Sequence, residues 1–303
     1  MGFKDFLAEM KEAYNEGRAE AREEYEQKQA EGQAEVDAAA EAFEQTSAGD
    51  RFAVALGAPY RALFVGDLDK AVKDGRPEYT LCTFFLPAEK KAELPQYLER
   101  DFDVVDAATL TQEVASLEAA LYTLILSGIL DRVKEGDGEA FATVAGHKEA
   151  LEEALQSFQI IAIGDFNQAR QRGDGDFSLI RDQRAKLAET CAQLHIDFPA
   201  YAALKKDLLA LWMARISYMV SGAVGLEYIA QGDAEDYLSG VTSLGVPLFA
   251  SWEEYAEAYL RGEKTDKTNN ALGRKILESN TKALLSKEES PWKVVPWPVP
   301  SGS

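Results

Sequence analysis

Arg215 is the side chain most suited to chemistry in this chain of 303 residues, because it lies within the most apolar stretch of the sequence, residues 208–229. A guanidinium keeps its proton at neutral pH, so a buried arginine needs a carboxylate or several carbonyl oxygens around it. Two interpretations are open: a structural ion pair that fixes the helix register, or a site for the carboxylate or phosphate of a ligand. Glu227 and Tyr228 follow in the same stretch and complete this candidate polar site.

Other patterns that carry chemistry are missing from the sequence. The two histidines, His147 and His195, are too few for most histidine-based metal sites, and neither lies in an H-E-x-x-H motif. There is no G-x-x-x-x-G-K-[ST] phosphate loop, and the serine of G-V-T-S-L-G lies too far after its glycine for a nucleophile elbow. Asp174 and Asp176 resemble part of a calcium loop that lacks its later ligands. We therefore expect no cofactor, no metal ion and no catalytic residues.

The element that must position Arg215 is a helix over residues 208–229. Apolar side chains occur on nearly every side of this helix, which is typical of a helix that neighbours bury on all faces. Its length would also suit a bilayer, but Arg215 and Glu227 would each cost roughly 3 kcal/mol there, so we favour a core helix. We expect it to end at Gly232, with Asp233 as the N-cap of the next helix.

Another helix start and a proline-rich tail follow. Ser251 and Glu254 form a capping box ahead of an apolar stripe, and Gly262 is the natural end of that helix. Residues 263–270 are polar and read as a loop, and residues 271–286 as a last helix. The tail S-P-W-K-V-V-P-W should be extended because of its prolines, with its two tryptophans pinning it across the body.

These segments resemble the bacterial family known as domain of unknown function 1266. The family pattern is a W-D-x-x-R helix leading to a second Arg and G-Y-I, then S-W-E-E-[FY]-x-x-x-Y-L-x-G, then S-P-W-x-x-x-P-W. Arg215 matches the first arginine, whereas Ser221 and Glu227 replace the second arginine and the glycine. The resemblance covers about residues 50–300 and implies a mostly helical fold and no known activity. The matching positions with an expected structural role are Ser251, Trp252, Glu254, Tyr255, Tyr259, Gly262, Pro291, Trp292, Pro296 and Trp297.

Residues 1–47 predict a separate N-terminal helix, because they are rich in Ala, Glu and Gln and contain no proline. The first 50 residues carry 14 acidic and 5 basic side chains. An apolar stripe at the start forms a tip, for which three roles are open: docking onto the protein's own body, binding a partner helix or a second copy, and contacting a membrane surface. The acidic polar face disfavours the membrane role. The tip residues are Phe3, Phe6, Leu7, Met10 and Tyr14.

The remaining chain, residues 50–300, predicts a single helical domain. The fold class is therefore mainly α: a multi-helix globular bundle with a long projecting N-terminal helix. A hinge is expected at residues 46–50, and the next helix should be kinked or ended at Pro59. Residues 79–86 are the one credible strand, with a buried irregular segment as the alternative, because a lone strand cannot make a sheet. Further helices are expected at residues 88–100, 106–133, 139–163 and 177–195.

Composition narrows the function. The net charge of −20 argues against nucleic acid and anionic membranes as partners, and favours basic proteins or small molecules. The two cysteines, Cys82 and Cys191, are expected to be buried free thiols, and the start lacks a secretory signal, which indicates the cytoplasm. We expect a non-enzymatic cytoplasmic binding or regulatory module, such as an immunity-like protein that neutralises a basic protein partner. The alternatives are an enzyme or small-molecule binder with a site around Arg215, and a membrane-peripheral scaffold that uses the N-terminal tip.

Overall fold

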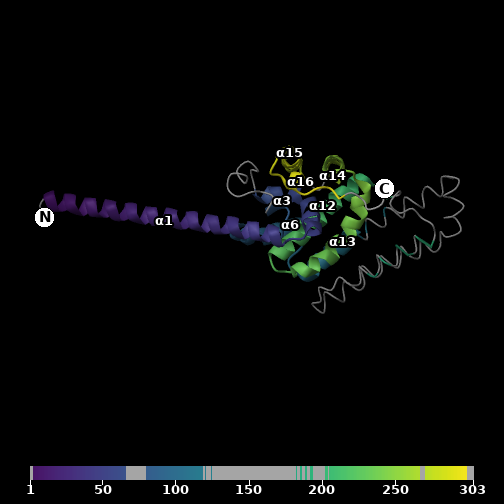
Figure 1. Cartoon of the computed structure of the whole chain (residues 1–303), viewed down its shortest axis with the longest axis horizontal. Coiled ribbons are helices and arrows are strands. Elements are labelled where there is room, and N and C mark those ends of the chain that lie inside the picture. The colour runs from purple at the N-terminus through teal and green to yellow at the C-terminus, as the bar shows by residue number, and fades with distance from the viewer. Residues whose placement is uncertain are drawn as a thin grey trace.

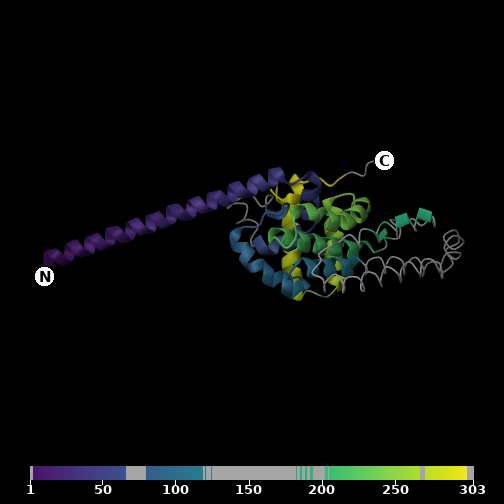
Figure 2. The same cartoon turned by 90° about the horizontal axis from the view of Figure 1, so that it is seen from below.

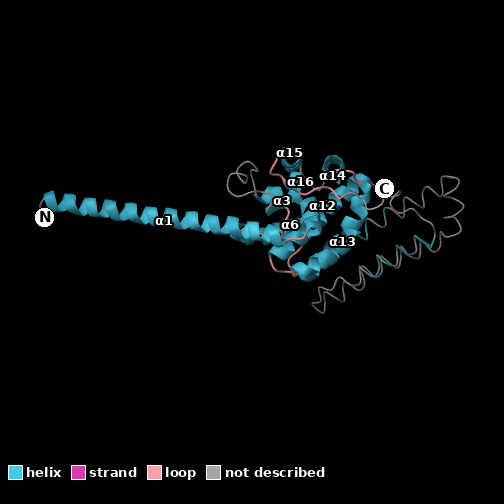
Figure 3. Ribbon diagram, in the orientation of Figure 1, coloured by secondary structure: helices cyan, strands magenta, loops and turns pink. Residues whose placement is uncertain are grey.

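The structure, a computed structural model, describes residues 3–65, 80–118, 205–266 and 270–298, with isolated residues between 120 and 203. These residues form a helical body with one long helix projecting from it, and contain no strand, which confirms the predicted fold class (Figures 1 and 3). The helix that begins at residue 107 is described as far as residue 118. The other elements are α1 (Phe3–Gln45), α2 (Ala48–Leu56), α3 (Ala58–Val65), α6 (Ala88–Phe102), α12 (Lys206–Gly225), η1 (Gln231–Asp233), α13 (Ala234–Gly245), η2 (Val246–Leu248), α14 (Trp252–Asp266), α15 (Ala271–Ser286) and α16 (Pro291–Val294).

The central element is α12, which packs against α2, α3, α6, α13 and α14. By length and composition α12 could cross a membrane, but 83% of its most apolar window is buried inside the protein. The prediction of a buried core helix is confirmed. The predicted end at Gly232 was wrong, because α12 stops at Gly225 and a turn precedes η1.

The helix α14 lies so close to α12 that Gly262 has no room for a side chain. A Cβ at this position would overlap the carbonyl oxygen of Asp207 and lie 3.0 Å from Leu211 Cβ. The sequence identified Gly262 as the end of a helix, but α14 continues to Asp266. The glycine therefore serves the contact between two helices, and the supposed loop after it begins one helical turn later.

The hinge between the N-terminal helix and the body lies where it was predicted. The Ser47 side chain caps α2 by accepting a hydrogen bond from the Asp50 backbone N–H at 3.0 Å. The next break falls at Gly57 and not at Pro59, because proline is well suited to the first turn of a helix and here lies in the first turn of α3. The Gly57 N–H donates to Ser217 of α12 at 2.9 Å, which ties the break to the core.

Residues 80–86 form a buried irregular segment and no strand, so the second of the two predicted alternatives is correct. Cys82 lies in this segment as a buried free thiol, as expected. Several other predictions fall outside the described residues: the helices at residues 139–163 and 177–195, most of the helix at 106–133, and the side chains His147, Asp174, Asp176, Cys191 and His195.

The helix α1 leaves the body as a single projecting element (Figures 1 and 2). Side chains 17–35 are all exposed, and intrahelical pairs such as Arg22–Glu26 at 2.8 Å support this stretch. The C-terminal end of α1 is anchored. Ala39 is buried, and Phe43 packs under the guanidinium of Arg51 at 4.1 Å. The tip lies at the far end of α1, so its backbone does not fold back onto the body.

Candidate functional site

Arg215 lies in the middle of α12 and forms a closed ion pair. Its Nη1 lies 2.6 Å from Oδ2 of Asp266, and its Nε donates to the Tyr60 hydroxyl at 3.2 Å. The side chains of Arg215 and Asp266 are only 11% and 20% exposed. Burial alone would lower the pKa of Arg215, but Tyr60, Asp266 and Glu263 outweigh it and raise that pKa. The guanidinium is therefore a permanent cation held by acidic neighbours.

Two phenols complete what we call the Arg215 cluster, which consists of Tyr60, Arg215, Tyr259, Glu263 and Asp266. The Tyr60 hydroxyl donates to the carboxylate of the buried Glu263. Burial raises the pKa of both tyrosines well above that of an ordinary phenol. Neither hydroxyl can therefore act as a base or nucleophile near neutral pH. The arrangement suits a structural role, the first of the two interpretations of Arg215.

The acidic members of this cluster were missed in the sequence because they follow Gly262. A usable signal was present: Tyr255, Tyr259, Glu263 and Asp266 recur at spacings of four, four and three residues, which places them on one face of a continuing helix. Tyr60, in the short α3, carried no comparable signal.

The predicted grouping of Arg215 with Glu227 and Tyr228 was wrong. Ten residues of α12 separate Arg215 from the helix end, a distance of roughly 15 Å. Glu227 is exposed and pairs with Lys91 at 3.3 Å, while burial raises the pKa of the half-buried Tyr228, as do the neighbouring Asp106 and Glu99. These two residues terminate the helix and do not share a site with the arginine.

Glu227 occupies a left-handed backbone position, with a φ angle of 62°. The Tyr228 N–H donates to the Ala223 carbonyl at 2.9 Å and the Glu227 N–H to the Val224 carbonyl at 3.0 Å. This is the Schellman arrangement, in which glycine is the preferred residue at the position of Glu227. The family pattern G-Y-I, which has glycine here, thus describes a helix end.

We expect Glu227→Gly to raise the free energy of unfolding by about 1 kcal/mol, because glycine removes the cost of a Cβ at positive φ. The lost pair with Lys91 is exposed and contributes little. Urea unfolding checks this. Glu227→Ala is the control, since it removes the carboxylate but keeps the Cβ, and it should not stabilise. Equal stabilisation by both variants would show that the carboxylate, and not the backbone, is responsible.

The C-terminal signature residues form an aromatic cluster, made of Phe52, Phe249, Trp252, Tyr255, Trp292 and Trp297. The rings of Trp252 and Trp292 stack with centroids 5.2 Å apart. Trp252 Nε1 donates to the Val295 carbonyl and Trp292 Nε1 to the Ala55 carbonyl, each at 2.8 Å. The prediction that the tryptophans pin the tail to the body is confirmed.

The tail itself differs from the extended chain that was predicted. The buried Pro291 begins one turn of helix, α16, with Ser290 as its N-cap, because a first-turn proline needs no hydrogen-bond donor. Pro296 follows it and is exposed. At the start of α14, Ser251 accepts from the Glu254 N–H at 3.3 Å, but the Glu254 carboxylate accepts from Ala250 in place of Ser251. All these signature residues serve the architecture.

Arg61 in α3 is a second buried arginine, and sequence reasoning missed it. Its side chain donates to the Thr80 carbonyl at 3.0 and 2.6 Å, to the Phe85 carbonyl at 3.1 Å and to Ser221 Oγ at 2.9 Å. Burial lowers its pKa to about 10, so it remains protonated at neutral pH. Within the described part of the chain, Arg61 forms no ion pair with a carboxylate.

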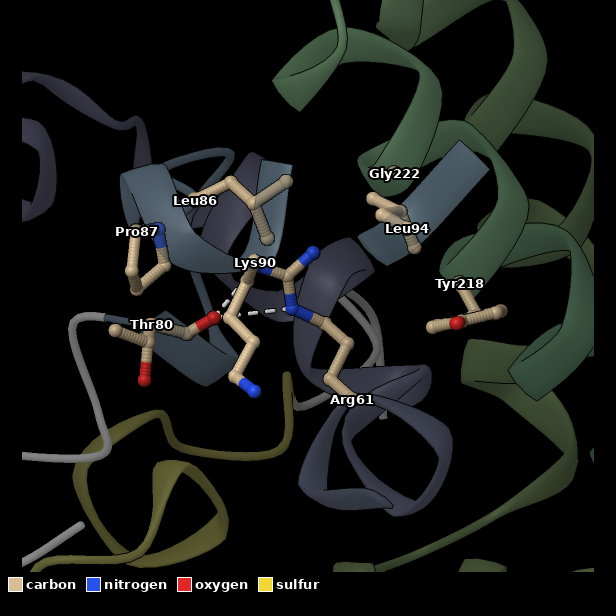
Figure 4. Close-up of a pocket in the computed structure, with 8 residues that line it drawn as sticks. All are labelled: Arg61, Thr80, Leu86, Pro87, Lys90, Leu94, Tyr218 and Gly222. Atoms are coloured by element: carbon tan, nitrogen blue, oxygen red, sulfur yellow. Dashed lines mark hydrogen bonds between the residues drawn. The ribbon is translucent and has the colours of Figure 1, made fainter. Parts of the chain in front are cut away.

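A pocket of about 330 Å³, counting its open mouth, lies beside Arg61 (Figure 4). The Arg61 guanidinium is directed toward Thr80. Tyr218 and Gly222 of α12 form one wall. The other lining residues are Leu86 and Pro87, which precede α6, and Lys90 and Leu94 within it. This pocket combines an unbalanced cation with apolar walls.

The tip residues Phe3, Phe6, Leu7, Met10 and Tyr14 lie in the first turns of α1, and their side chains are outside the described part of the structure.

Comparison with known proteins gives one match. A family model described as "Protein of unknown function (DUF1266)" matches residues 2–297, nearly the whole chain. No curated protein and no solved structure matches.

Proposed function

This chain belongs to the DUF1266 family of proteins of unknown function, and we propose that it is a non-enzymatic cytoplasmic binding module that engages a basic protein partner through α1. The carrying observation is the exposure of α1 between residues 17 and 35, on every side of the helix. A helix that is polar all round contributes nothing to a core, so its length serves another purpose. Binding a partner is such a purpose.

The charge of α1 favours a basic partner. The helix holds 13 acidic and 5 basic residues, a net charge of −8 over residues 3–45. Acidic surfaces attract basic proteins at long range and speed their association, and they repel nucleic acid and anionic membranes. A second copy of this acidic helix would be repelled in the same way, which makes a different protein the better candidate.

The mounting of α1 supports a role in presenting its tip. The Glu35 carboxylate accepts from the Ala88 N–H at 3.1 Å, at the start of α6, and Arg51 donates to the Thr46 carbonyl at 2.9 Å. These contacts fix the direction in which α1 leaves the body. At the helical rise, residues 3–35 extend roughly 50 Å beyond the anchor. A partner would meet the arm well before it meets the body.

The interior of the body supports the non-enzymatic part of the proposal. The Arg215 cluster is closed by an ion pair, and its tyrosines are held neutral. Among the described residues no group of three or more His, Cys, Asp or Glu side chains could hold a metal ion. An alternative ligand site at Arg215 would require the pair with Asp266 to open. The other alternative, a membrane-peripheral scaffold, would require the tip to bind lipid against the charge of α1.

Capture from the cells that naturally produce the protein tests the proposal. The full chain is compared with a stem variant in which Glu20, Glu23, Glu24 and Glu31 become Gln, and with a body control in which Glu99, Glu257, Glu288 and Glu289 become Gln. All eight side chains are exposed or half-exposed. At about 0.1 M salt, where exposed charges still interact over roughly 10 Å, we expect the stem variant to retain the partner about tenfold less than the wild type or the body control.

The partner is identified by mass spectrometry and rebound in purified form. Equal retention by the stem variant and the body control would overturn the proposal, and so would capture of acidic proteins only. Light scattering of the purified chain and sedimentation with anionic vesicles identify the competing outcomes, self-association and membrane binding.

A further inference from the structure

We infer that the pocket beside Arg61 binds a small organic carboxylate. This site lies on α3, α6 and α12 and does not involve the exposed arm of α1, so it is independent of the function proposed above.

The first argument is charge balance. The chain has two buried arginines, and Arg215 has the carboxylate of Asp266 at 2.6 Å. Arg61 is more deeply buried, at 5% exposure, yet its hydrogen bonds go to two backbone carbonyls and one hydroxyl. Carbonyl dipoles solvate a cation but do not neutralise it, and a buried charge without a counter-charge is costly. An anion in the adjoining pocket would supply the missing charge.

The second argument is the donor that remains. A guanidinium carries five N–H groups, two of them on Nη1. Ser221 accepts from Nη1, while Nε and Nη2 donate to Thr80 and Phe85, so one N–H of Nη1 has no acceptor among the described residues. Arg61 can therefore give an anion one further charge-assisted hydrogen bond without breaking the existing ones.

The third argument is a second cation in the lining. Lys90 is half-buried, with 24% of its side chain exposed, and its Nζ lies 3.2 Å from the more exposed Glu93. An ammonium has three donors, so it can hold Glu93 and a ligand together. The backbone N–H at the start of α6 is already taken, because Glu35 accepts from Ala88. The anion would therefore sit between the Arg61 guanidinium and Lys90.

The walls determine the rest of the ligand. Apart from Arg61, Thr80 and Lys90, the lining is Leu86, Pro87, Leu94, the ring of Tyr218 and Gly222. These surfaces suit a short hydrocarbon chain. One N–H from Arg61 and one ammonium suit a single planar carboxylate better than a phosphate dianion, which needs more donors. A volume of about 330 Å³ lies at the lower end of ligand pockets, so the ligand is small.

Titration calorimetry of the full chain with sodium butyrate tests the inference. We expect saturable one-to-one binding of butyrate, and none of 1-butanol, which has a similar chain without the charge. Lys90→Gln should weaken butyrate binding about fivefold, since a partly exposed charge contributes modestly. Lys91→Gln is the matched control: Lys91 is the next residue, pairs with Glu227 outside the pocket, and should leave binding unchanged.

A second variant tests Arg61 itself. Arg61→Lys keeps a cation but loses the fork of donors, and after circular dichroism has confirmed its fold it should bind butyrate at least tenfold more weakly. Should this variant fail to fold, the comparison of Lys90→Gln with Lys91→Gln decides alone. Absence of saturable butyrate binding, equal binding by the two lysine variants, or preferential binding of inorganic phosphate would each overturn the inference.

Discussion

Replacing Arg215 with methionine should lower the free energy of unfolding by about 4 kcal/mol, the typical cost of removing one partner from a buried ion pair. Methionine fills a similar volume, so the loss is electrostatic. It leaves the Asp266 carboxylate, only 20% exposed, and the buried Glu263 without their cation. The Tyr60 hydroxyl also loses a hydrogen bond from Arg215. Urea unfolding at neutral pH, followed by circular dichroism, measures the change.

Arg261→Met is the matched control, because Arg261 pairs with Asp207 at 3.0 Å on the surface, where the side chains are 51% and 40% exposed. Exposed pairs of this kind contribute at most about 1 kcal/mol. If the two arginine variants lose similar stability, the Arg215 cluster is not the electrostatic centre of the core. A nearly neutral Arg215→Met that loses binding of a small anion would favour a ligand site in its place.

Trp292→Ala should also cost about 4 kcal/mol, as is usual when a buried large aromatic side chain is truncated. Trp292 is 4% exposed and stacks on Trp252, and its Nε1 donates to the Ala55 carbonyl at 2.8 Å. The alanine variant loses the packing and leaves this carbonyl without that donor. Urea unfolding gives the stability, and a red shift of the remaining tryptophan fluorescence in the native state would report release of the tail.

Val294→Ala is the neighbouring control, since Val294 lies in the same helical turn but is 42% exposed, and should change stability by less than about 0.5 kcal/mol. Trp292→Phe should fall between the two, because it keeps a ring but not the indole N–H. A loss from Trp292→Ala no larger than from Val294→Ala would mean that the aromatic cluster does not hold the tail.

The core helix was predictable because burial on all sides leaves a direct trace in composition. Residues 209–223 of α12 are apolar around the whole helix, and the structure buries nearly all of them. Its end was not predictable from the glycine at position 232. Termination occurs at Glu227, a residue that disfavours positive φ, so the local preference pointed away from the actual stop. Neighbouring segments override local preference at such positions.

Arg215 was identified because a charge stands out within an apolar helix. Arg61 was not, since the residues around it in the short α3 resemble any half-buried helix. One hint existed at Ser221, where the family resemblance leads us to expect arginine. The structure places Arg61 Nη1 2.9 Å from Ser221 Oγ, so another helix supplies a guanidinium at this place. Only the tertiary arrangement brings residues 160 positions apart into contact.

The irregular form of residues 80–86 has the same origin. Their β-branched and aromatic composition favours a strand, but the Thr80 and Phe85 carbonyls accept from Arg61. Carbonyls that point inward at a guanidinium are not available to a neighbouring strand. A buried charge thus dictates the backbone of a segment that contains no charged residue between positions 80 and 86.

The aromatic cluster joins the first helix of the body to the last described segment, because Phe52 of α2 meets Trp297, and Ala55 accepts from Trp292. Neither extremity of the folded unit is therefore loose enough to peel away by itself. Fraying, the usual cheapest way for a helical protein to open, must first break the same set of ring contacts from either direction. Such a closed loop favours unfolding in a single cooperative event.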